Sequence, residues 1–163
     1  MSAPRDSGSS NPPREWYAEG LAFSCTQCGN CCTGPPGAVW FTDEEEIAMA
    51  ERLGLDLDAF RDRYVRRLGK GRSLVERETE FGHDCVFLDR ESQPGKAVCS
   101  IYEARPLQCR TWPWWPENLA SRRSWDAVRR RTPCPGMGRG TVHSLQRIRI
   151  VRDEQAGQDE PAW

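Results

Sequence analysis

The sequence predicts a small α+β fold: an irregular, metal-stabilised single domain with several short helices and a short β-hairpin. One observation is length, since 163 residues suit one domain with a modest core. Another is that the periodic segments are short and are separated by Gly and Pro. The third is a set of eight cysteines, which would place metal ligands on loops. A fold of this kind depends on its metal for stability.

The two ends of the chain differ in composition from its centre. Residues 1–14 are rich in Ser, Pro, Gly and Asn, so we expect a disordered N-terminal tail rather than a secretory signal. Residues 15–152 would form the metal-binding domain, and residues 153–163 a C-terminal tail. No apolar run approaches the roughly 20 residues of a membrane span. The net charge of −1 gives no case for a nucleic-acid partner, and we expect a cytoplasmic protein without a membrane partner.

Two helices are expected in the first half of the chain. The first would begin at Thr42, an N-cap that forms a capping box with Glu45, and would end before Gly54. The second would run from about 58 to 68, where apolar residues recur at helical spacing. Both helices would serve as scaffold.

A hairpin and two further helices are expected in the second half. Strand-like runs at 86–88 and 97–102 are separated by a polar turn that contains Pro and Gly. A third helix is expected from about 117 to 130. For 144–156 the pattern allows a helix or a strand, and we favour the helix.

The cysteines fall into two groups of four. The first group is a compact run around a glycine: Cys25, Cys28, Cys31 and Cys32. The second group is spread over the C-terminal half: Cys85, Cys99, Cys109 and Cys134. In a reducing cytosol such a set binds metal or does redox chemistry more often than it forms disulfides. We therefore expect all eight cysteines to be metal ligands.

The spacing favours an iron–sulfur cluster but leaves Zn²⁺ open. Structural zinc usually takes two ligands from one such run, whereas three ligands in one run are more typical of iron–sulfur proteins. Adjacent side chains usually diverge, so Cys31 and Cys32 should not easily serve one tetrahedral ion. Cys32 would then face a second metal, bridge two metals or pack as an apolar residue. In number, eight thiolates suffice for two sites of four.

Other residues near the cysteines have more than one possible role. Arg105 and Arg110 flank Cys109 and would either donate hydrogen bonds to sulfur or form surface salt bridges. His83 lies two residues before a cysteine and could replace one ligand, although a lone histidine is more often structural. The tryptophan-rich segment 112–116 would shield a cluster, form a docking surface or make a small satellite core.

Several catalytic motifs are missing from the sequence. It contains no dinucleotide-binding or phosphate-binding glycine loop, no Gly-x-Ser-x-Gly and no His-Glu-x-x-His. We therefore expect that any catalysis would be carried out by the metal.

The order of the motifs resembles a known family. The run from Phe23 to Cys32 is similar to the signature of the YkgJ-type cysteine-cluster family, a zinc- or iron-chelating CxxCxxCC domain. The likeness covers roughly Glu15 to Gly140 and continues, in order, through 39–42, 85–88, 99–106, 109–110, Pro113 and 134–138. A related cysteine region occurs in flagellin lysine N-methylases. The resemblance implies metal chelation, with protein modification as a further role, although no S-adenosylmethionine site is recognisable here.

Three functions stay open at this point. The first is a metal-cluster protein that holds an iron–sulfur cluster or zinc and has a redox or accessory role in protein modification. The second is a structural zinc module that binds a protein partner through its tryptophans. The third is metal storage or delivery.

Overall fold

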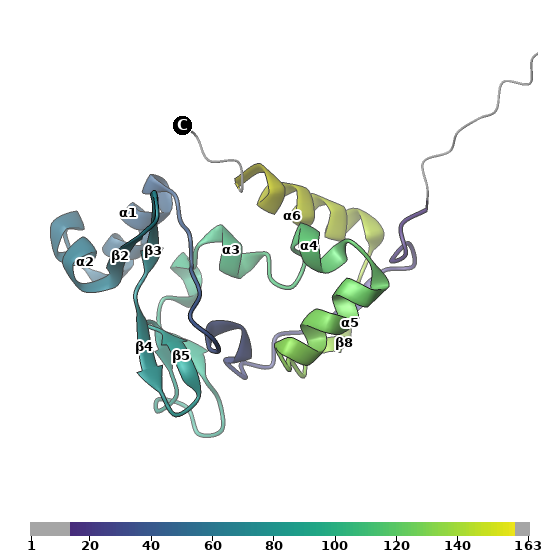
Figure 1. The fold of residues 1–163 in the computed structure, drawn as a ribbon, viewed down its shortest axis with the longest axis horizontal. Helices are drawn as coiled ribbons and strands as arrows, with labels where there is room; N and C mark the ends of the chain where they lie inside the picture. The colour runs from purple at the N-terminus through teal and green to yellow at the C-terminus, as the bar shows by residue number, and fades with distance from the viewer. Residues whose placement is uncertain (1–13, 159–163) are drawn as a thin grey trace, which may run out of the picture.

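The computed structural model describes residues 14–158, and these form the small α+β domain that the sequence predicts (Figure 1). The first half contains β1 (Leu21–Phe23), the 3₁₀ turn η1 (Asn30–Cys32), α1 (Asp43–Leu53), α2 (Leu57–Tyr64), β2 (Val65–Leu68), β3 (Gly71–Leu74), β4 (Glu76–Thr79) and β5 (Gly82–Cys85). The second half contains β6 (Leu88–Asp89), β7 (Val98–Cys99), the 3₁₀ turn η2 (Tyr102–Ala104), α3 (Leu107–Arg110), α4 (Pro116–Leu119), α5 (Arg122–Arg131), β8 (Met137–His143) and α6 (Leu145–Gln158). Within the described residues the strands form four two-stranded antiparallel sheets.

The N-terminal helix begins and ends where the sequence predicts. Thr42 accepts a hydrogen bond from the backbone N–H of Glu45, and the Glu45 carboxylate accepts one from the backbone N–H of Thr42. Gly54 ends α1 in the left-handed conformation, with φ of 66°. This capping box is therefore confirmed.

The second helix is shorter than predicted. It ends at Tyr64, and residues 65–68 form β2 instead of the last helical turn. Val65 pairs with Leu74 across the hairpin, and the tight turn between the strands uses Gly69 with a left-handed φ of 59°. Strand pairing with a later segment overrides the helical spacing that the sequence alone displays.

The other predicted elements are present with altered bounds. The hairpin of 86–88 and 97–102 is reduced to β6 and β7, and a second hairpin, β4–β5, precedes it. The helix expected over 117–130 is divided into α4 and α5, because Ser121 caps a new helix by accepting from the backbone N–H of Ser124. The segment 144–156 is helical, as we favoured.

The two predicted tails have different outcomes. Residues 1–13 of the predicted N-terminal tail lie outside the described residues, as do residues 159–163. Helix α6 continues to Gln158 and so includes the first part of the predicted C-terminal tail. In the described part of the chain no helix is long and apolar enough to cross a membrane.

The hydrophobic core consists of two clusters. One packs α1, α2 and the hairpin strands and contains Met49, Ala50, Phe60, Leu74, Phe87 and Ile101. The other packs α4, α5, β8 and α6 and contains Tyr17, Trp114, Leu119, Trp125, Val128, Cys134, Met137, Ile148 and Val151. Figure 1 shows these two groups of elements on opposite sides of the molecule, with α3 between them.

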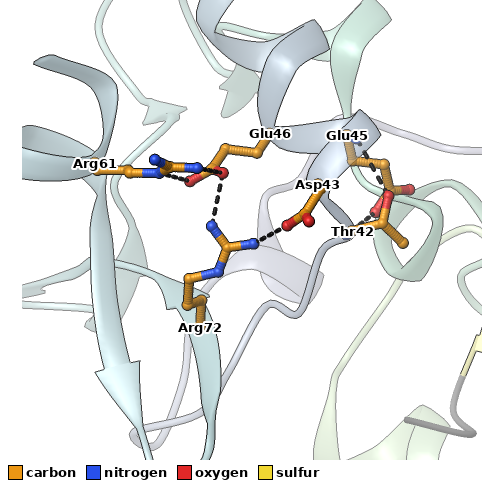
Figure 2. Close-up of polar contacts among 6 residues, drawn as sticks. All are labelled: Thr42, Asp43, Glu45, Glu46, Arg61 and Arg72. Carbon is orange, nitrogen blue, oxygen red and sulfur yellow. Dashed lines mark hydrogen bonds and ion pairs between the residues drawn. The ribbon is translucent and has the colours of Figure 1, made fainter. Parts of the chain in front are cut away.

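A buried ionic network fixes α1 against the first hairpin (Figure 2). Glu46 is fully buried, and its carboxylate accepts hydrogen bonds from Arg61 Nη2 at 2.8 Å and Arg72 Nη1 at 2.6 Å. Arg72 also reaches Asp43 at the start of the same helix. Burial alone would raise the pKa of Glu46, but the two guanidinium hydrogen bonds outweigh it and leave the pKa lowered. The ionised carboxylate therefore stabilises the fold.

Replacing Arg72 tests this network. Arg72→Met should lower the free energy of unfolding at neutral pH by about 1–3 kcal/mol, because a buried carboxylate loses a charged donor. Glu46 has a lowered pKa in the folded protein. Its contribution to stability is therefore fully present above the ordinary pKa of a glutamate, and it is lost as the pH falls from there through the lowered pKa. In Arg72→Met the pKa of Glu46 in the folded protein should lie closer to its ordinary value, so less stability should be lost over the acid range. Urea unfolding across the acid range measures both effects.

The matched control is Arg14→Met, since Arg14 and Glu19 form an ion pair whose side chains are 77% and 85% exposed. Such a surface pair contributes little, so this variant should unfold as the parent protein does. Equal losses in both variants would contradict a special role for the buried network.

Candidate metal centre

The first cysteine run occupies the loop after β1 and the turn η1, and it packs closely on the β6–β7 hairpin. The backbone N–H of Ala97 donates to the carbonyl of Gln27 at 2.8 Å. Gly29 adopts a left-handed φ of 73°, and a Cβ added there would lie only 2.6 Å from the Cβ of Ala97. Only glycine allows this approach, which brings the run next to the hairpin that carries Cys99.

The second group of cysteines reaches the same region from separate elements. Cys85 ends β5, Cys99 ends β7, and Cys109 lies in α3. Cys134 follows α5 in the loop that leads into β8. Cys85 and Cys99 therefore sit on different hairpins, β4–β5 and β6–β7, and both line one cavity.

Six of the eight cysteines line one cavity of about 200 Å³. They are Cys25, Cys31, Cys32, Cys85, Cys99 and Cys109. Apolar side chains of the first core cluster, including Leu74, Phe87 and Ile101, form much of the remaining wall. The structure thus gathers most of the predicted ligands around one interior space.

Cys28 and Cys134 lie outside that wall. Cys28 lines a second cavity, together with Arg77 and Phe81. Cys134 is 8% exposed and belongs to the second core cluster. The Asn30 side chain donates to the carbonyl of Pro133 at 2.8 Å, and this contact holds the Cys134 loop beside the first cysteine run.

We expected the side chains of the adjacent cysteines to diverge, but they lie together. The sulfur atoms of Cys31 and Cys32 lie 3.6 Å apart. Two sulfurs bound to one tetrahedral zinc ion would be separated by about 3.8 Å, so adjacency does not prevent a shared metal. Among the residues described, however, no three His, Cys, Asp or Glu side chains are placed closely enough to hold one ion. The donors surround a volume and do not converge on one point.

The metal-free site is a set of weakly acidic thiols. Burial raises the pKa of Cys85 to about 11, and it also raises the pKa values of Cys99, Cys109 and Cys134. The hydrogen bond between the adjacent cysteines lowers the pKa of Cys31 to about 7 and raises that of Cys32. Metal binds thiolates, so loading the site must release protons. Soft sulfur donors of this kind suit zinc and iron–sulfur clusters.

The two flanking arginines have different roles. Arg105 stacks on Tyr102, with 3.5 Å from its guanidinium carbon to the ring centroid, and its charge opposes the effect of burial on the Cys99 and Cys109 pKa values. Arg110 instead forms an ion pair with Glu45 at 3.6 Å. Arg105 is therefore the one that provides positive potential at the thiols.

Polar contacts that the sequence does not reveal position Cys109. Gln108, its neighbour in α3, accepts from the backbone N–H of Trp40 at 2.8 Å and donates to the carbonyl of Ala38 at 3.0 Å. Glu45, besides capping α1, accepts from the backbone N–H of Leu107 at 2.6 Å. These contacts fasten α3 to the N-terminal half of the domain.

The tryptophan-rich segment is divided between core and cavity. Trp114 is 5% exposed and stacks on Trp125 within the second main core cluster, so it belongs to the core and not to a satellite of it. Trp112 and Trp115 line the cysteine cavity. Trp115 donates its ring N–H to the carbonyl of Gln108 at 2.9 Å. The ring N–H of Trp112 is buried without an acceptor among the described residues.

The two histidines also differ in position. His83 lines the cysteine cavity, so the hypothesis that it replaces a cysteine ligand stays open. His143 contacts the carbonyl of Phe23 through Nε2 at 3.0 Å and packs against Trp114. The ring of His143 therefore holds β1 and β8 together.

Comparison with known proteins confirms the predicted resemblance. A family model described as "CxxCxxCC: Putative zinc- or iron-chelating domain" matches residues 24–135, which is more than half of the chain. The description covers both metals that the sequence leaves open. A curated relative, "Uncharacterized protein MJ0661" of Methanocaldococcus jannaschii, is 33% identical over 98 residues. That match covers 60% of this chain, and the chain spans about half (48%) of the relative's length. No solved structure matches the chain.

The close approach at Gly29 leads to a testable expectation. Gly29→Ala should lower the metal content per chain and the stability, because the new Cβ strains the backbone and collides with Ala97. Gly54→Ala is the matched control, since Gly54 is also left-handed but has open space where the Cβ would lie. It should cost about 1–2 kcal/mol of stability and keep the metal. Metal analysis and urea unfolding distinguish the two, and equal metal content would contradict the role given to Gly29.

Proposed function

The chain belongs to the CxxCxxCC family of zinc- or iron-chelating domains, and from this premise we propose that it holds an iron–sulfur centre with a redox or accessory role. The observation that carries the proposal is the arrangement of the thiols around a cavity of about 200 Å³. One water molecule needs about 10–15 Å³ of such space, so the cavity has room for a centre of several atoms. A single zinc ion would instead require donors that converge on one point.

The chemistry of the wall supports the same proposal. The lining cysteines would supply the thiolates, and an iron–sulfur cluster, when bound, would supply one-electron chemistry. Four thiolates around a doubly charged cluster leave a charge of about −2, which the nearby Arg105 would offset. Leu74, Phe87 and Ile101 would exclude water from the centre. Apolar surroundings and hydrogen bonds to sulfur are the means by which a protein sets the potential of such a centre.

Exposed thiols favour metal delivery as a second candidate. Cys25 and Cys31 are exposed at the rim, whereas the other lining cysteines are partly buried. A metal bound near these two residues could be passed to an incoming thiol by ligand exchange. A structural zinc module with a tryptophan docking face has less support, because Trp114 is buried and Trp112 and Trp115 face the cavity.

We further propose that one domain spans residues 15–152. Glu15 forms ion pairs with Arg149 at 2.6 Å and with Arg152 at 2.7 Å, which joins the beginning of this segment to α6. The pairing of β1 with β8 makes the same connection.

We also propose a cytoplasmic location, because free thiols suit a reducing compartment. We propose a protein partner and no nucleic-acid partner.

The first test is the composition of protein purified without oxygen. We expect iron and acid-labile sulfide, with a broad absorption band near roughly 400 nm from thiolate-bound iron. Removal of the metal should also abolish the cooperative thermal transition followed by circular dichroism. A colourless protein that contains zinc and no sulfide would contradict the iron–sulfur proposal.

The unpaired N–H of Trp112 gives a sharper test. A buried donor without an acceptor is unfavourable by about 1–3 kcal/mol, so we expect a sulfur of the bound centre to accept its hydrogen bond. Trp112→Phe should make the midpoint potential more negative, because it removes that donor while keeping an aromatic ring. Trp115→Phe removes an N–H that already has an acceptor, and should leave the potential nearly unchanged. Equal shifts of the midpoint potential in the two variants would contradict a hydrogen bond from Trp112 to the centre.

A further inference from the structure

Charge is distributed unevenly along the chain. Residues 105–152 contain eleven arginines and two acidic residues, whereas residues 14–104 contain seventeen acidic and eleven basic residues. The net charge of −1 therefore conceals a basic segment and an acidic one. Six exposed arginines of the basic segment lie on α5 and β8, and we call them the basic surface: Arg122, Arg123, Arg129, Arg130, Arg131 and Arg139.

The basic surface lies on the solvent side of α5. Trp125 and Val128 form the buried side of this helix. Since each residue turns the helix by about 100°, Arg123 and Arg130 lie opposite these two. The solvent side is therefore centred on two arginines, seven residues apart in the sequence.

The fold gives little reason for these charges. Arg122 lies 3.5 Å from Asp126, and in the described part of the chain the other five arginines form no salt bridge. The first turn of α5 contains no acidic residue and instead carries Arg122 and Arg123. A cation at that end of a helix opposes the helix dipole, and neighbouring cations repel one another. The arrangement does not stabilise α5, so it points to an anion from outside the domain.

Strand β8 connects the basic surface to the first cysteine run. A Cβ added at Gly138 would lie 3.4 Å from Nη1 of Arg129, so the Arg129 side chain lies over this strand. Figure 1 shows α5 and β8 next to each other. Further along β8, the backbone N–H of Thr141 donates to Oγ of Ser24 at 2.9 Å. The residue after Ser24 is Cys25, whose side chain is exposed.

The end of α5 makes a second connection to the same run. The helix ends at Arg131, two residues before Pro133. The Asn30 side chain donates to the carbonyl of Pro133 at 2.8 Å, and the next residue is the exposed Cys31. The basic surface therefore adjoins the rim at which the two exposed cysteines lie.

We propose that the basic surface is the docking site for a protein partner that presents a carboxylate-rich surface. The inference rests on the proposed function, because a redox protein and a metal-delivery protein both need a second protein at the rim of the site. Charge complementarity defines the chemistry of this partner. A guanidinium group binds a carboxylate through two parallel hydrogen bonds, and these arginines are not engaged in that way within the domain. Such a partner, once docked, lies beside Cys25 and Cys31.

A nucleic acid fits this surface less well. Helix α5 has ten residues and so is about 15 Å long. The acidic segment of the same domain would repel a polyanion that extends beyond the basic surface. A protein can confine its acidic residues to a patch of matching size, and it can also carry the group that receives electrons or metal. The observations therefore favour a protein.

Charge-reversed variants of the full chain test the proposal. The probe is fluorescein-labelled decaglutamate, and fluorescence anisotropy measures its affinity. The parent protein should bind the peptide, and added salt should weaken the binding. Arg123→Glu with Arg130→Glu should lower the affinity by about tenfold or more. The matched control is Arg52→Glu with Arg63→Glu, which makes the same change of charge at exposed residues of α1 and α2 and should lower the affinity by about twofold at most.

The place at which the peptide binds is a second measurement. Decaglutamate that carries a benzophenone should cross-link on illumination to α5, to β8 and to the first cysteine run, and mass spectrometry locates the linked residues. Cross-links concentrated on α1 and α2, or equal losses of affinity in the two double variants, would overturn the proposal. Circular dichroism establishes that both variants are folded.

Other occupants give different results. The proposal is overturned if a DNA or RNA duplex binds more tightly than decaglutamate at equal ionic strength and Arg123→Glu with Arg130→Glu abolishes that binding. It is also overturned if the parent protein forms a dimer that the same variant cannot form, since the occupant is then a second copy of this chain. The metal and sulfide content of the parent protein is measured separately. A protein without a metal centre that still binds the peptide at this surface would contradict the proposed function and not the docking site.

Discussion

The structure depends on one electrostatic constraint: groups that must become anions to bind metal are enclosed in an apolar interior. Burial raises the pKa of Cys85 to about 11 and raises that of Cys109 as well, so these thiols are neutral until a cation replaces their protons. Several thiolates in one cavity would repel each other strongly without that cation. Metal binding and folding are therefore parts of one equilibrium in this protein, because the cation removes a cost that the packing imposes.

The hydrophobic core of the domain is divided into two clusters, and this division meets the constraint. Two apolar clusters lie on opposite sides of the molecule, and α3, which bears Cys109, lies between them (Figure 1). Polar side chains then fix the segments that bear the cysteines. Gln108 and Glu45 hold α3, and Asn30 holds the loop of Cys134. Each fastens backbone groups of distant segments, so contacts other than those of the sulfurs set the positions of the sulfurs.

Features that depend on near neighbours in sequence could be predicted, and features that depend on distant contacts could not. The capping box of Thr42 and Glu45 involves one helical turn, and the sequence displays it directly. Residues 65–68 display helical spacing, yet their pairing with 71–74 makes them a strand. Gln27, which precedes Cys28, is left-handed, and glutamine is a residue type that gives no local sign of that conformation. The position of Cys134 depends on a contact from Asn30 across 103 residues.

The pairing of β1 with β8 has a consequence for how the domain opens. Glu15 and Arg152 are far apart in the sequence, yet their side chains are joined at 2.7 Å. Tyr17 near the first strand and Val151 in the last helix belong to the same core cluster, so neither end can detach without exposing apolar surface of the other. The two ends of the domain are therefore expected to unfold together and not to fray one after the other.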